Sequence, residues 1–96
     1  MSDTVTEAVN ALNARMTGTQ MEGTAKFVIA GEGAVMIDAA GARASDDPAD
    51  VTLSADAATF RAIVKGDMDP AAAFMTGKLG VEGDMSVAMQ LGRVLG

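Results

Sequence analysis

The side chains best suited to chemistry in this chain are hydroxyls and carboxylates, because the sequence contains no histidine and no cysteine. A serine nucleophile needs a base to activate it, and in many hydrolases it lies in a G-x-S-x-G elbow. The serines have neither feature: Ser2, Ser45, Ser54 and Ser86. Histidine and cysteine are also the usual ligands of zinc and of transition metals. The residue inventory therefore predicts a protein that is not an enzyme and that uses no metal and no cofactor.

The carboxylates that lie close together in the sequence have simpler roles at turns and helix starts. Asp46, Asp47 and Asp50 surround a proline, but this run lacks the alternating oxygen ligands, the central glycine and the final glutamate of an EF-hand loop. A solvated turn is therefore favoured over a calcium site. Asp67 and Asp69 lie beside a turn and a helix start, so we interpret them as structural and not as a catalytic pair.

The run Gly31-Glu32-Gly33 is similar to the opening of a dinucleotide-binding motif. That motif needs a third glycine and a following helix, whereas position 36 is methionine and the apolar alternation resumes at Val35 and Ile37. The pattern is typical of two strands joined by a glycine-containing turn. We therefore favour a β-hairpin over a nucleotide site.

Length and charge limit the domain organisation and the partners. Ninety-six residues fit a single domain over residues 1–96. The formal net charge of −6 argues against nucleic acid as a partner and against more than transient contact with anionic membranes. The first residues lack the basic and apolar regions of a signal peptide, and no run approaches the roughly 18 apolar residues of a membrane span. We therefore expect a cytoplasmic protein.

Apolar periodicity and capping residues predict alternating helices and strands. Asp56, Asp69 and Asp84 each precede a helical pattern and are predicted N-caps, and Pro70 suits the first helical position. The predicted elements are a helix over 2–16, a hairpin over 24–38, a weak strand over 39–44, a strand over 51–53, helices from 57 to 66 and over 71–76, a strand over 79–83 and a last helix from 85.

The last helix has an unusually wide apolar surface. At 100° per residue its polar side chains Ser86, Gln90 and Arg93 occupy about 60° of arc, whereas a helix that covers one face of a sheet needs an apolar arc of only about 100° or somewhat more. Neighbouring helices, a partner subunit or a bound lipid would have to cover the remainder. The residues alone favour protein packing, and the eight methionines, which are common gap-fillers in cores, do not change that order.

The second half of the chain carries a recognisable run of residues. Between Asp50 and Leu91 it contains Asp50-Val51-Thr52-Leu53, Gly66-Asp67-Met68-Asp69-Pro70, Ala73-Phe74-Met75-Thr76-Gly77-Lys78-Leu79, Val81-Glu82-Gly83-Asp84-Met85 and Ala88-Met89-Gln90-Leu91. This run closely resembles the sterol carrier protein 2 domain family, the non-specific lipid-transfer proteins, in a small, stand-alone, bacterial-type form. Gly80 within a strand and Gly92 within the last helix depart from the pattern.

The resemblance implies an α+β fold with a five-stranded, mainly antiparallel sheet, helices packed on one side, and an apolar tunnel between them. It implies binding of a fatty acid, a fatty acyl group or a sterol-like molecule without catalysis, with Gly66, Gly77 and Gly83 at turns. By position, the implied ligand-binding residues that line the tunnel are Phe27, Ile29, Val35, Ile37, Phe60, Ile63, Val64, Phe74, Met75, Leu79, Val81, Met85, Met89 and Leu91.

The resemblance reverses the order of explanations for the last helix, because a ligand beneath it becomes the favoured cover. The leading hypothesis is a lipid carrier whose specificity comes from the shape of the tunnel. The alternative is an accessory module of lipid metabolism, in which the apolar helix forms a homodimer or docks onto a lipid-metabolism enzyme.

Overall fold

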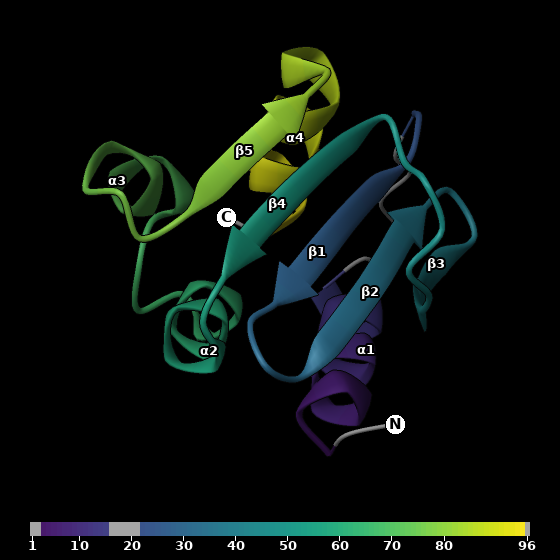
Figure 1. Ribbon diagram of the computed structural model, residues 1–96, viewed down its shortest axis with the longest axis horizontal. Coiled ribbons are helices and arrows are strands. Elements are labelled where there is room, and N and C mark those ends of the chain that lie inside the picture. The colour runs from purple at the N-terminus through teal and green to yellow at the C-terminus, as the bar shows by residue number, and fades with distance from the viewer. Residues whose placement is uncertain (1–2, 16–21, 96) are drawn as a thin grey trace.

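The computed structural model describes residues 3–15 and 22–95 of the chain. The elements follow the predicted order, and Figure 1 shows their arrangement. They are α1(Asp3–Arg15), β1(Ala25–Ile29), β2(Gly33–Asp38), β3(Gly41–Ala44), β4(Val51–Ala55), α2(Ala57–Lys65), α3(Pro70–Met75), β5(Gly80–Gly83) and α4(Met85–Leu95). The ends predicted for the first helix at residues 2 and 16 lie outside the described residues.

The strands form one five-stranded sheet in the order β3-β2-β1-β4-β5. β1 pairs antiparallel with β2 and parallel with β4, and the two outer pairings are antiparallel. Parallel neighbours need a crossover, and here the connection from β1 to β4 runs through β2, β3 and the segment 45–50. Lys26 on β1 holds this segment through an ion pair of 3.1 Å with Asp46. The predicted α+β class and mainly antiparallel sheet are confirmed.

Two helices cover different halves of the same face of the sheet. α1 contacts β2 and β3, whereas α4 contacts β1, β4 and β5. The Asn13 side chain of α1 fixes the first half: its amide donates to the Ala42 carbonyl oxygen at 3.0 Å and its oxygen accepts from the Ala42 N–H at 2.8 Å. These two bonds satisfy backbone groups of the edge strand β3. They also fix the position of α1 relative to that strand.

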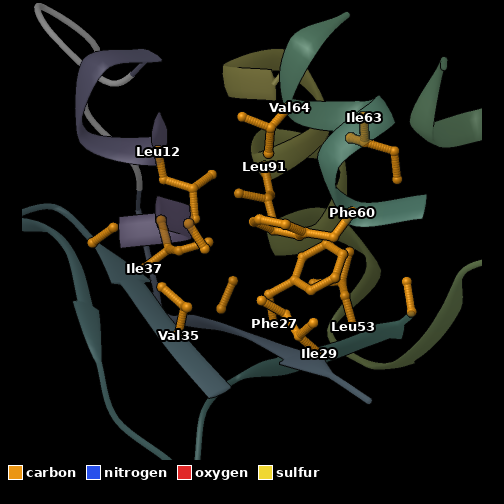
Figure 2. Packing of buried hydrophobic residues seen from close by; sticks show 14 of the residues in the cluster. Leu12, Phe27, Ile29, Val35, Ile37, Leu53, Phe60, Ile63, Val64 and Leu91 are labelled. Atoms are coloured by element: carbon orange, nitrogen blue, oxygen red, sulfur yellow. The ribbon is translucent and has the colours of Figure 1, made fainter. Parts of the chain in front are cut away.

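The core lies between this face of the sheet and the helices, as Figure 2 shows. Phe27 on β1 and Phe60 on α2 are almost fully buried, and their rings meet edge to face with centroids 4.6 Å apart and an interplanar angle of 72°. Alternate residues of the strands point into this layer, which explains the burial of Phe27 and Ile29 on β1. No helix of the described chain is long and apolar enough to cross a membrane.

The predicted caps set the ends of the helices. The Asp56 carboxylate accepts from the Thr59 N–H at 2.7 Å, and this bond is the main reason that the pKa of Asp56 lies below its usual value. Asp69 accepts from the Ala71 N–H at 3.3 Å, and Gly66 closes α2 in the left-handed conformation. α3 ends at Met75, one residue earlier than predicted.

Two glycines let the short edge strand β5 approach β4 closely. A Cβ at Gly83, where φ is +114°, would collide with the Asp50 carbonyl oxygen, and a Cβ at Gly80 would lie 2.7 Å from the Ser54 Oγ. Gly80 and Ser54 are direct partners in the strand register. The departure at position 80 therefore has a steric explanation, because only glycine fits opposite this serine without displacing it.

Candidate functional site

An apolar pocket of about 420 Å³ lies between the sheet, α2, α3 and α4. Its volume falls within the range of roughly 300 to 1,000 Å³ that is usual for small-molecule sites. Figure 1 shows α3 and α4 beside β5, the edge strand at this end of the sheet. The pocket is therefore on the half of the sheet that α4 covers, away from α1.

The floor of the pocket is a row of apolar side chains across three strands. Phe27 on β1 is the direct register partner of Leu53 on β4, and Leu53 is the partner of Val81 on β5. Residues in register project to the same face of a sheet, so the three side chains form one continuous surface. All three line the pocket, and Val81 is the least buried of them.

The roof of the pocket is one side of α4. Ala88 and Met89 lie three and four residues after Met85, Gly92 lies four and three residues after them, and all four line the pocket. Val87 and Leu91 lie on the adjacent stripe and are buried in the core, and Leu91 also borders the pocket. Met85 and Met89 remain 51% and 61% exposed. The protein core thus covers only part of the apolar circumference of α4, and the rest faces the pocket.

α3 forms the outer wall. Its Ala73 is buried, whereas Pro70, Ala71 and Phe74 line the pocket and Phe74 is 48% exposed. Pro70 follows the N-cap Asp69, which fixes where this short helix begins. The wall is apolar, and the half-exposed ring of Phe74 lies at the margin of the pocket.

Polar contacts hold α4 to the segments that precede β1 and β4. The Asp84 carboxylate accepts from the Ser86 hydroxyl at 2.7 Å and from the Ser86 N–H at 2.9 Å, and these bonds hold the pKa of Asp84 below its usual value. The Gln90 side chain accepts from the Glu22 N–H at 2.8 Å, and the Asp84 N–H donates to the Asp50 carbonyl oxygen. Ser86 and Gln90 of the polar stripe of α4 therefore attach the helix, and its apolar side is left for the pocket.

The structure brings part of the predicted tunnel-lining set together on the pocket surface. The predicted residues that line the pocket are Phe27, Ile63, Phe74, Leu79, Val81, Met85, Met89 and Leu91. Five others belong instead to the buried core cluster: Ile29, Val35, Ile37, Phe60 and Val64. Met75 is 83% exposed and lies outside the pocket lining. Contact of each residue with a ligand remains a prediction.

The pocket also includes residues that the sequence analysis did not name as site residues. They are Leu53, Asp69, Pro70, Ala71, Ala88, Gly92 and Arg93. Helical spacing alone would have found Ala88 and Gly92, because they share a stripe with Met85 and Met89. Leu53 would have followed from the strand register, which the local pattern does not contain.

Charge is sparse around the pocket. Among the lining residues that the structure describes, only Asp69 and Arg93 are charged, and the others are apolar side chains, glycine or proline. The same part of the chain contains no group of three or more acidic side chains that could hold a metal ion. The described lining therefore offers almost only apolar contacts to whatever fills the pocket.

Solved structures with the same fold are sterol carrier proteins. The solution structure of sterol carrier protein-2 from Aedes aegypti in complex with palmitate, a C16 fatty acid, superposes with a TM-score of 0.78 and 24% identity, over 99% of this chain and 96% of that chain. The crystal structure of sterol carrier protein 2 like 2 from the same organism gives a TM-score of 0.78 at 19% identity, over 95% of each chain. At these identities the similarity shows the shared fold.

A curated relative of this chain is longer than the chain itself. Hydroxysteroid dehydrogenase-like protein 2 from Xenopus tropicalis is 39% identical in an alignment 83 residues long that covers 78% of this chain and 20% of that protein. This chain thus spans about a fifth of the length of the relative. The sequence also matches the model of the SCP-2 sterol transfer family over residues 2–96, and the chain therefore belongs to that family.

Proposed function

We propose that this protein binds and carries a lipid with a long hydrocarbon chain, such as a fatty acid or fatty acyl group, in the apolar pocket. The observation that carries the proposal is that Met85 and Met89 of α4 line the pocket and stay exposed, although Val87 and Leu91 of the same helix are buried by the protein. The palmitate held by a structural neighbour of the same fold supports this ligand class. A continuous tunnel through the domain is part of the same proposal.

Burial of hydrocarbon supplies enough free energy for useful affinity. At about 0.8 kcal/mol per methylene, complete transfer of a C16 tail gains at most about 12 kcal/mol. Association costs of several kcal/mol reduce this, so we expect dissociation constants from micromolar to nanomolar. Specificity then comes mainly from the shape of the pocket. Carriage without catalysis agrees with the sparse charge around it, and the cytoplasmic location remains a prediction.

A second candidate function is an accessory module that docks through its apolar surface. Among the described side chains of α3 and α4, four large apolar ones are exposed, namely Phe74, Met75, Met85 and Met89. A partner subunit, or an enzyme of lipid metabolism, would bury the same surface that we assign to lipid. A lipid and a partner protein cannot occupy this surface at the same time, so the two functions predict different complexes.

Native mass spectrometry of gently purified protein distinguishes these functions. We expect a monomer that carries the additional mass of one lipid, and solvent extraction of the same sample should release that lipid for identification. An empty and stable dimer would contradict the carrier function and support the accessory module.

A further inference from the structure

Arg93 is the one cation among the described residues that line the pocket. It lies in the last turn of α4, four residues after Met89 and directly after Gly92, and all three residues line the pocket. Its side chain is exposed. Arginine can lay its aliphatic stem along an apolar wall while its guanidinium stays in water. The position therefore presents a positive charge at the solvent side of a hydrocarbon-binding surface.

The guanidinium of Arg93 has no partner among the residues that the structure describes. Arg43 pairs with Asp38 at 2.7 Å, and Arg61 pairs with Glu7 at 2.9 Å. Among the arginines whose side chains the structure describes, Arg93 alone has no carboxylate within 4.0 Å and no hydrogen bond. The chain has 13 acidic residues against 7 basic ones. An arginine without a partner in so acidic a chain leaves its five donors available to an external anion.

We propose that Arg93 binds the ionised headgroup of the lipid, so that the pocket prefers fatty acid anions over neutral lipids of the same chain length. This inference rests on the proposed lipid-binding function. A planar guanidinium matches the two oxygens of a carboxylate and forms two parallel charge-assisted hydrogen bonds with it. A headgroup at Arg93 keeps its hydration while the tail is buried, so the cost of moving a carboxylate into hydrocarbon is avoided.

Asp69 is the other charged residue of the pocket, and it acts in the opposite direction. Its carboxylate accepts from the Ala71 N–H as the N-cap of α3, which explains its presence without a ligand. A negative charge at the margin of the pocket repels an anionic headgroup. Replacing it with asparagine keeps a good N-cap and removes only the charge.

A purely structural role for Arg93 makes a different prediction. A cation in the last turn of a helix interacts favourably with the helix dipole, an effect that changes stability and not ligand preference. The preference for one headgroup over another is thus the property that separates the two roles. It requires two ligands with equal tails, and palmitate and hexadecanol meet this condition.

The test compares palmitate with hexadecanol on delipidated protein by isothermal titration calorimetry at low salt. We expect Arg93→Gln to weaken palmitate binding by about fivefold to tenfold and hexadecanol binding by less than about twofold. Asp69→Asn should strengthen palmitate binding by about twofold. High salt should reduce the preference of the wild type for palmitate, because the headgroup contact is exposed. Arg43→Gln, on the β3 strand and outside the pocket lining, is the matched control and should change neither ligand.

Each result has one interpretation. An unchanged ratio of palmitate to hexadecanol affinity in Arg93→Gln, including equal losses for both ligands, would overturn the role of Arg93 and leave lipid binding intact. Failure of wild-type protein to bind either ligand would instead overturn the proposed function itself, and the inference with it. We expect the circular dichroism spectrum of Arg93→Gln to match that of the wild type, because the substituted side chain is exposed.

Discussion

Replacing Met89 with glutamate is expected to lower the affinity for palmitate by at least about tenfold, or 1.4 kcal/mol. Met89 lines the pocket, so the change places a carboxylate where the tail must lie. Binding of the tail would strip water from this carboxylate, and the free energy of that desolvation weakens binding. The introduced carboxylate also lies four residues before Arg93, which is the spacing for ion pairs on a helix. It would withdraw that guanidinium from the headgroup. Calorimetric titration measures the loss.

The matched control is Met75→Glu on α3. Both methionines are exposed, at 61% for Met89 and 83% for Met75, so neither substitution should unfold the protein. Only Met89 lines the pocket. We therefore expect Met75→Glu to bind palmitate within about twofold of wild type. Equal affinities for Met89→Glu and wild type, with both proteins folded, would place the ligand elsewhere.

The second large effect is on stability, and it concerns Phe60. Phe60→Ala should lower the free energy of unfolding by about 3 to 5 kcal/mol, because it removes a fully buried ring and its edge-to-face contact with Phe27. That loss is a large part of the roughly 5 to 15 kcal/mol that small domains possess. Urea denaturation measures it.

Phe74→Ala is the comparison for this effect. Phe74 is 48% exposed and lines the pocket, so its removal should cost roughly 1 kcal/mol of stability or less while weakening palmitate binding. Phe60 lies outside the pocket lining. Phe60→Ala should therefore lose much stability, while the molecules that stay folded bind palmitate with nearly wild-type affinity. Stability losses of similar size for the two variants would contradict the division between core and pocket.

Local signals predicted the elements because they act within a few residues. The Asp56 cap and the Gly66 stop define α2 from its own sequence, and the glycine-containing turn after Ile29 joins β1 to β2 as expected. The parallel pairing of β1 with β4 was not encoded in any such pattern. It joins segments more than twenty residues apart, and neither strand shows from its own alternation which neighbour it will have.

The same limit explains which site residues the sequence could place. Alternation shows that Val35 and Ile37 point to the same side of β2, but it does not show which helix covers them. α1 contacts β2 and β3, so these side chains pack in the core beneath α1. Phe27 also belongs to the core, but it lies on the part of the sheet that α4 contacts and therefore borders the pocket. Met75 follows Phe74 by one residue, and adjacent residues on a helix point in different directions.

Methionine-methyl NMR tests directly whether the apolar side of α4 that the core leaves uncovered binds the lipid. Met85 and Met89 line the pocket, whereas Met75 lies outside it and Met36 is buried on β2, outside the core cluster between sheet and helices. Adding palmitate should shift the methyl resonances of Met85 and Met89 and leave those of Met36 and Met75 nearly unchanged. Saturable palmitate binding that leaves Met85 and Met89 unshifted would contradict the assignment of this side of α4 to lipid.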